Sequence, residues 1–187
     1  GIIENYHDLK TILEKSGVNF ISDTDTEIIS QLINIELING KKPLEAFKNT
    51  ITKLEGAYAI VAIFRGYDDL MIGTKLGSPL LYMKAKNMII LSSDAYSISD
   101  YGSSVTYLED GDIIVTEKSK ISLHDSSLKT IQRPSKKIKK RDKDGLNGYD
   151  HFMIKEIKEQ PDVLSHALSY YLNFSKYKIN LEKYNFD

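Results

Sequence analysis

The chain has 187 residues and no cysteine. The absence of thiols excludes disulfide bonds, zinc sites built on cysteine and a cysteine nucleophile supplied by these residues. Long apolar runs are also missing, since none approaches the length of a membrane span, and no basic segment followed by an apolar one stands at the start. These absences predict a cytoplasmic protein that has no membrane partner.

An excess of charge of either sign is lacking as well. Lys and Arg together number 25, and Asp and Glu number 26, so the formal net charge is −1. This balance gives no general attraction to nucleic acid or acidic lipid, and neither is expected as a partner. The 41% hydrophobic content is still enough for a packed core, and the length is typical of one domain with at most an appendage.

Helical patterns fill the first third of the chain. The spacing of apolar residues predicts a helix over 6–16, which Gly17 ends. A short extended run at 18–21 follows, and we interpret it as a strand. The next helix is predicted over 26–39 and is apolar on more than one face, as expected of a helix packed between layers. Pro43 suits the first turn of a third helix.

The apolar period changes in the middle of the chain. Residues 57–64 form a continuous run of small, aromatic and β-branched residues, which predicts a strand covered on both faces. A returning strand is predicted at 70–74, and two hairpins at 80–91 and 113–124. Helices followed by a series of antiparallel strands indicate an α+β domain.

Beyond residue 133 this pattern stops, and six of the eight residues from 136 to 143 are basic. Such a run can touch phosphate, yet it lacks interleaved aromatic residues and a nucleic-acid-binding signature, so we interpret it as a solvated linker. Tyr149–Gln160 has a helical pattern, and Pro161 can open a further helix that ends near residue 173. The sequence therefore predicts three segments, at 1–133, 134–148 and 149–187.

Two carboxylates and three hydroxyls converge in the turn from Ser22 to Thr26, between the extended run and the most apolar helix. Thr24 and Glu27 fit a capping box, so helix initiation is one interpretation. A turn of this kind also offers unpaired N–H groups and the positive end of a helix dipole. An Asp that faces a pocket here would pair with the ammonium of a small ligand such as an amino acid. The residues alone leave both interpretations open.

Short motifs stand in a fixed order along the chain. They read Gly-Ile-Ile-Glu-Asn at 1–5, Ser-Asp-Thr-Asp-Thr-Glu-Ile-Ile at 22–29, Leu-Glu-Gly-Ala-Tyr-Ala at 54–59, Gly-Ser-Pro-Leu at 77–80, Ser-Asp at 93–94, Leu-Glu-Asp-Gly-Asp-Ile at 108–113 and His-Phe-Met-Ile-Lys-Glu-Ile-Lys-Glu-Gln-Pro at 151–161. The ordered set resembles the isomerising glutamine–fructose-6-phosphate amidotransferases, and the resemblance covers nearly the whole chain. It implies an N-terminal-nucleophile fold, an αββα sandwich of stacked antiparallel sheets. It implies no cofactor.

The resemblance also implies a reaction and two site residues. The family transfers the amide nitrogen of glutamine to fructose 6-phosphate through a covalent thioester on an N-terminal cysteine, giving glucosamine 6-phosphate and glutamate. Asp25 matches the residue that binds the α-ammonium of glutamine. Gly1 matches the glycine whose backbone N–H points into the oxyanion hole.

The cysteine, the Asn before Gly1 and the Arg loop that holds the substrate carboxylate have no counterpart in this sequence. We therefore expect a truncated chain, inactive alone, that holds the C-terminal part of the glutaminase domain and, from 149, a helical junction and the start of the isomerase domain. Its expected partners are glutamine, a second copy or a complementary N-terminal glutaminase segment, and an isomerase domain. The alternative is a non-catalytic homologue that binds a partner chain, or glutamine weakly.

The remaining candidates have simpler interpretations. Ser78 lies in a tight turn rather than a nucleophile elbow, and residues 110–112 resemble a hairpin turn more than a calcium loop. Lys155 and Glu156 are expected to hydrogen-bond between domains rather than act as an acid–base pair. The histidines lack metal-ligand spacing and stand at His7, His124, His151 and His166.

Overall fold

The computed structural model describes residues 1–139, 146–173 and 178–179. These residues divide into two units, Gly1–Arg141 and Asp142–Asp187. Helices α1–α3 and strands β1–β10 belong to the first unit, and α4 belongs with β11 and β12 to the second.

The helices of the first unit are α1 (Tyr6–Lys15), α2 (Glu27–Ile38) and α3 (Pro43–Ile51). Helices α1 and α2 agree with their predictions to within one residue, α3 begins at the predicted Pro43, and Gly17 ends α1 in the left-handed region. The strand predicted at 18–21 is wrong, because this segment pairs with no described strand. Its last N–H group donates to the carboxylate of Glu27 instead.

Two antiparallel sheets follow the helices. The larger has the order β1-β2-β3-β7-β8-β9. Its strands are β1 (Ile2–Ile3), β2 (Gly56–Phe64), β3 (Tyr67–Leu76), β7 (Ile113–Glu117), β8 (Lys120–His124) and β9 (Thr130–Ile131). The smaller sheet has the order β10-β6-β4-β5, with strands β4 (Leu81–Lys84), β5 (Ile89–Ser92), β6 (Ser104–Tyr107) and β10 (Ser135–Lys137).

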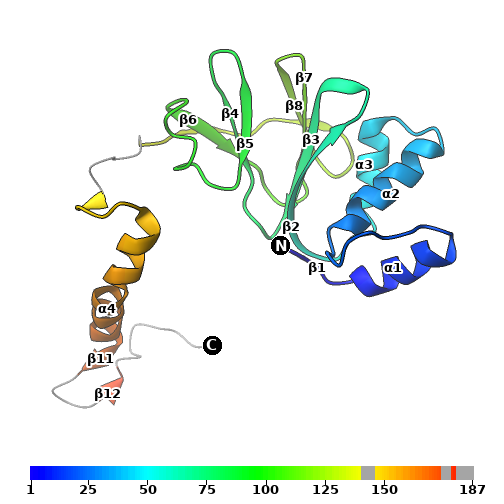
Figure 1. Cartoon of the computed structure of the whole chain (residues 1–187). Coiled ribbons are helices and arrows are strands. Elements are labelled where there is room, and N and C mark those ends of the chain that lie inside the picture. The colour runs from blue at the N-terminus through cyan, green and yellow to red at the C-terminus, as the bar shows by residue number, and fades with distance from the viewer. Residues whose placement is uncertain (140–145, 174–177, 180–187) are drawn as a thin grey trace. The chain divides into compact units, whose positions relative to one another are not determined.

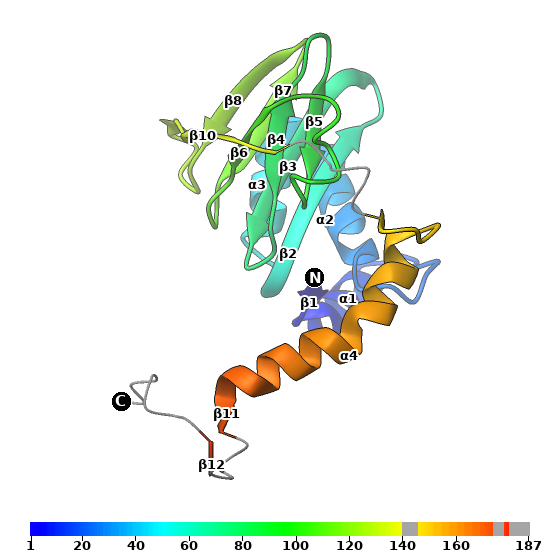
Figure 2. The ribbon, with the colours of Figure 1, turned by 90° about the vertical axis from the view of Figure 1, so that its left-hand side faces the viewer.

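The helices and the two sheets form successive layers in the first unit (Figure 1). One face of the larger sheet packs against the helices through Ile72, Phe47 and Ile28. Its other face meets the smaller sheet through Ile114 and Leu80. Figure 2 views the unit with the smaller sheet in front. The predicted α+β class with stacked antiparallel sheets is confirmed.

Beyond Ala57, where its pairing with β1 ends, strand β2 forms one edge of the larger sheet, and within the described residues it is covered on one face only (Figure 2). Tyr58 and Phe64 point to the helices and are buried, whereas Val61 is 43% exposed and Ile63 is 80% exposed. The prediction that this strand is covered on both faces is therefore wrong within the described residues. Its apolar alternate side chains are accessible to solvent or to another chain.

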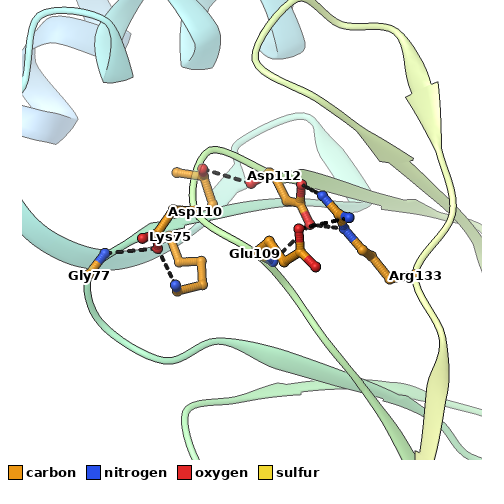
Figure 3. Close-up of polar contacts among 7 residues, drawn as sticks. Lys75, Gly77, Glu109, Asp110, Asp112 and Arg133 are labelled. Carbon is orange, nitrogen blue, oxygen red and sulfur yellow. Dashed lines mark hydrogen bonds and ion pairs between the residues drawn. The ribbon is translucent and has the colours of Figure 1, made fainter.

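The first residues of the segment predicted as a basic linker form a strand instead. Ser135–Lys137 forms β10 and pairs with β6, where Ser135 lies opposite Thr106. Just before it, the Arg133 guanidinium binds both carboxylate oxygens of Asp112, at 2.8 and 2.9 Å, and Glu109 at 2.8 Å (Figure 3). Residues 133–137 therefore belong to the folded first unit.

Other residues of this chain hold the acidic turn at 109–112 in place. One oxygen of Asp110 accepts the Gly77 N–H at 3.0 Å and pairs with Lys75 (Figure 3). The hydrogen bond from Lys75 lowers the pKa of the Asp110 carboxyl. Asp112 is 2% exposed, and its charge is matched by Arg133. The turn thus fastens the end of β3 to the segment that leads into β10.

The second unit contains α4 (Phe152–Tyr171), β11 (Leu172–Asn173) and β12 (Lys178–Ile179). Helix α4 is continuous and has Pro161 in its interior, so the prediction of two helices is wrong. A proline removes only one hydrogen bond of the helix, and helical residues stand on both sides of it here. Lys155 pairs with Glu159 at 3.6 Å along the same helix. No helix among the described residues is long and apolar enough to cross a membrane.

Candidate functional site

The turn before α2 does not form the predicted capping box. The helix begins at Glu27 with Thr26 as its N-cap, and no side chain of the described residues caps it. The Thr24 hydroxyl lies 2.9 Å from the Ser22 hydroxyl instead. Asp25 is therefore not the cap of this helix, and its carboxylate is free for another contact.

Glu27 folds back over the turn. Its carboxylate accepts the N–H groups of Ile21 and Ser22, the latter at 2.7 Å, and also the Ser22 hydroxyl at 2.7 Å. Gln31 donates from the next helical turn at 3.1 Å. These hydrogen bonds, foremost the one from the Ser22 hydroxyl, lower the pKa of Glu27 to about 2, although desolvation acts against them. Glu27 therefore stays ionised and ties the turn to α2.

Asp25 reaches in a different direction, towards β1. Its Oδ2 accepts the backbone N–H of Ile3 at 2.8 Å, and the Asp25 side chain is half-buried. Because β1 lies at the edge of its sheet, this N–H points away from β2, and Asp25 satisfies it. Among the described residues Oδ1 has no hydrogen-bonding partner, so one carboxylate oxygen remains for a ligand.

Two glycines let the backbone of β1 lie against the start of β2. A Cβ added to Gly1 would overlap the Ala57 carbonyl oxygen and lie 2.9 Å from the Tyr58 Cα. A Cβ added to Gly56, whose φ is +113°, would overlap the Ile2 carbonyl oxygen. Only glycine fits such close approaches of backbone to backbone, and the Gly1 nitrogen is thereby fixed in place.

Gly1 and Asp25 line the same hollow, which has a volume of about 80 Å³. Its other lining residues are Ile3, Thr26, Ile29, Tyr58, Ala59 and Ile60. Burial raises the pKa of the Tyr58 hydroxyl in this wall. The structure thus brings together the two residues that the sequence analysis selected. The structure also places Tyr58 in the wall of the hollow. In the sequence, the only sign of such a role was its position in the motif at 54–59.

The hollow is much smaller than the 300–1,000 Å³ or so of typical small-molecule sites. It shares four lining residues with a groove of about 610 Å³ between α2 and the edge of β2. Ile29, Ile33 and Leu37 line one side of this groove, and the run 59–65 lines the other. Strand β1 pairs only with Gly56 and Ala57, so no described strand pairs with the β2 edge from Ala59 onward. We call this surface the β2 groove.

The other candidates are not brought together. His7 is on α1 and His166 on α4, while the Nε2 of His124 on β8 lies 3.1 Å from the Ser122 hydroxyl. The described residues include no cluster of three or more metal-ligating side chains. Ser78 follows β3 in a tight turn, in which its N–H donates to the Leu76 carbonyl at 2.7 Å. The hollow beside Gly1 is therefore the candidate site.

A family model described as a glutamine amidotransferase domain matches residues 1–100, which include Gly1, Asp25 and every residue that lines the hollow. The chain belongs to this family. The amidotransferase relationship predicted from the ordered motifs is confirmed.

Relatives match the glutamine amidotransferase domain and the residues beyond it. The glutamine–fructose-6-phosphate aminotransferase (isomerizing) of Brucella abortus is 37% identical over 188 residues, covering 100% of this chain and 31% of the relative. The enzyme of the same name from Bradyrhizobium diazoefficiens is 39% identical over 184 residues, covering 97% of this chain and 30% of the relative. The chain thus spans about a third of the length of these relatives.

A solved structure resembles the same domain. It is the glutamine phosphoribosylpyrophosphate amidotransferase of B. subtilis, complexed with ADP and GMP, with a TM-score of 0.56 and 24% identity. The match covers 67% of this chain and 28% of that one. This likeness shows that the two share a fold.

The first prediction concerns the hydrogen bond that Asp25 accepts. Asn caps a helix about as well as Asp, so Asp25→Asn would leave stability unchanged if Asp25 were only a cap. Because Asp25 is not the cap, we expect Asp25→Asn to change the free energy of unfolding. Asp25→Ala should lower the free energy of unfolding by about 1 kcal/mol, because a half-buried charged hydrogen bond is lost. Asp23→Ala, in the same turn but exposed, should stay within about 0.5 kcal/mol of the wild type. Urea unfolding of the three variants measures this, and equal stabilities for Asp23→Ala and Asp25→Ala would contradict it.

The second prediction concerns pH. The pKa of Glu27 falls from an ordinary 4.5 to about 2 in the folded chain, so its contribution to stability is complete above pH 4.5 and is lost as the pH falls towards 2. Wild-type stability should therefore fall more steeply over this window than that of Glu27→Gln. Urea unfolding at several pH values tests this, with exposed Glu14→Gln as the control. Parallel curves for the wild type and Glu27→Gln would show that the carboxylate contributes nothing.

Proposed function

We propose that this chain forms part of the glutaminase portion of an enzyme that transfers the amide nitrogen of glutamine to fructose 6-phosphate, giving glucosamine 6-phosphate and glutamate. The observation that carries the proposal is the hollow that Asp25 and Gly1 both line. Relatives named for this reaction match along the whole chain, which supports the choice of sugar substrate. Because the chain spans about a third of their length, we assign the sugar chemistry to the rest of the enzyme.

Asp25 is proposed to bind the α-ammonium of glutamine. Its carboxylate is half-buried, it is oriented by the Ile3 N–H, and one of its oxygens has no partner among the described residues. A charged hydrogen bond between carboxylate and ammonium is shorter and stronger than a neutral one, and it orients an amino acid. Gly1 lines the same hollow, and its nitrogen is proposed to face the oxygen on which negative charge develops during acyl transfer.

The covalent step needs a thiol that this chain does not contain. The β2 groove suggests where the missing groups come from. It opens into the hollow and offers an unpaired strand edge together with the apolar side chains of α2. We propose that a complementary glutaminase segment bearing the cysteine adds to β2 as an antiparallel strand in line with β1, whose pairing with β2 already has this direction. Exposed strand edges accept added strands in this way.

Two further assignments belong to this proposal. We assign α4 and the residues after it to the junction with a sugar-isomerising domain. The absence of disulfides is consistent with the cytoplasm as the place of action. The competing function is a non-catalytic module that binds a partner chain, or glutamine weakly, and the missing cysteine is the observation that favours it.

We predict that this chain alone releases no glutamate from glutamine. The nucleophile is absent, and removing a covalent nucleophile costs an enzyme several powers of ten in rate. A coupled glutamate assay with a heat-killed control measures the residual activity. Glutamate release above that control, abolished in Asp25→Ala, would overturn the prediction.

We predict a one-to-one complex with a separate polypeptide that carries the cysteine-initiated glutaminase segment of a relative. Size-exclusion chromatography with light scattering measures the mass, and glutamate release by the mixture distinguishes the enzyme from the binding module. Ile63→Lys should prevent association by placing a charge on the open face of β2, whereas Ile12→Lys, on the exposed part of α1, should not.

Two outcomes would reject the cysteine-initiated glutaminase segment as the partner of this chain. A homodimer that Ile63→Lys abolishes would show that a second copy occupies the β2 groove. A monomer that ignores the added segment would show that the edge stays unpaired.

A further inference from the structure

The segment 18–22 has an unusual support. It pairs with no described strand, so strand pairing does not hold its backbone in place. The carboxylate of Glu27 accepts both Ile21 and Ser22, and it also accepts the Ser22 hydroxyl. The backbone hydrogen bonds from the start of α2 to the turn measure 3.4 Å from Glu27 to Thr24, 3.3 Å from Ile28 to Asp25 and 3.1 Å from Ile29 to Thr26. Val18 and Phe20 pack against the core, and Glu27 accepts most of the side-chain hydrogen bonds that join the segment to α2.

Asp25 lies between the points that Glu27 holds, Ser22 on one side and the start of α2 on the other. Its own contact runs outward, to the Ile3 N–H on the edge of β1. Strand β1 is only two residues long and pairs with β2 through Ile2 and Ile3 alone. The placement of Asp25 relative to Gly1 thus depends on one hydrogen bond, and the direction of that bond depends on the turn.

We infer that Glu27 is a positioning residue of the candidate site. It holds the turn so that Asp25 stays bonded to the Ile3 N–H, with its other oxygen directed at the hollow beside Gly1. The inference rests on the proposed role of Asp25 in binding the α-ammonium of glutamine. It gives Glu27 a task beyond the favourable interaction of a negative side chain with the positive end of its own helix.

The test measures the amide of Ile3 by NMR in the chain as it stands. Glu27→Gln should lower the hydrogen-exchange protection of this amide by about tenfold or more and shift its proton resonance upfield, because the hydrogen bond to Asp25 loosens. The amides of Ile72 and Ile113, in the centre of the larger sheet, should keep their protection and so report an intact fold.

Glu36→Gln is the matched control. Glu36 lies on the same helix, loses the same charge, and likewise accepts hydrogen bonds from Asn49 and Lys53, each at 2.8 Å. It makes no contact with the turn, so the Ile3 amide should not change. If Glu27→Gln speeds exchange along α2 but leaves Ile3 unaltered, Glu27 serves only its helix, and the inference is wrong.

A milder variant covers the case in which Glu27→Gln does not fold. Ser22→Ala removes the hydroxyl that donates to Glu27 at 2.7 Å and leaves the carboxylate in place. It should also lower the hydrogen-exchange protection of the Ile3 amide, but by less than Glu27→Gln does. An unchanged Ile3 amide in Ser22→Ala overturns the inference in that case.

Titration with glutamine separates this inference from the proposed function. If glutamine shifts the Ile3 and Asp25 resonances of the wild type, Glu27→Gln should raise the Kd by about tenfold and Glu36→Gln by less than about twofold. Equal Kd values in the wild type and Glu27→Gln would overturn the positioning role. If the wild type does not respond to glutamine, the ligand role of Asp25 fails in this chain, and the Ile3 amide still decides whether Glu27 positions Asp25.

Discussion

Two consecutive isoleucines on β7 hold the layers of the first unit together. Successive side chains of a strand point to opposite faces, so Ile113 packs into the helices and Ile114 packs against the smaller sheet. Both are fully buried. Since β7 is an inner strand of the larger sheet, this pair joins the core on one face of that sheet to the core on the other. The edge strands, where the candidate site lies, are positioned by that central packing.

The site itself depends on backbone groups more than on side-chain packing. The Gly1 nitrogen, the Ile3 N–H and the unpaired edge of β2 are all main-chain features, and they are available because β1 is short. Asp25 adds to this arrangement a carboxylate with one oxygen unpaired among the described residues. The hollow of about 80 Å³ beside it shares lining residues with the groove of about 610 Å³ along the strand edge.

Apolar periodicity predicted most of the fold. It located α1–α3, β2 and the β4–β5 and β7–β8 hairpins, because these elements bury a regular face and their neighbours are close in sequence. Strands β6 and β10 were missed, since their pairing partners lie far along the chain and their residues show no clear alternation. The segment 18–21 has strand-like residues but no partner strand among the residues that the structure describes, and the local pattern could not show whether a partner strand exists.

The candidate site was predictable in part. The ordered motifs pointed to Asp25 and Gly1, and the structure brings both to one hollow. The reach of Glu27 to Ile21 and Ser22 was not predictable, because the spacing from Thr24 to Glu27 suggested a local capping box. Which backbone groups Glu27 binds depends on how the extended segment folds back over the helix. That is a tertiary feature with no signature in the local sequence.

The ion pair between Arg133 and Asp112 has a mechanical consequence. It stands just before β10, which is the last strand of the first unit, so any tension on the chain beyond Lys137 is carried first by the pairs between β10 and β6 and then by this clamp. The hydrogen bonds between the two strands and the two hydrogen bonds from the Arg133 guanidinium to Asp112 resist such a load together. A pull on the chain beyond Lys137 would therefore act first on the smaller sheet and on the turn at 109–112.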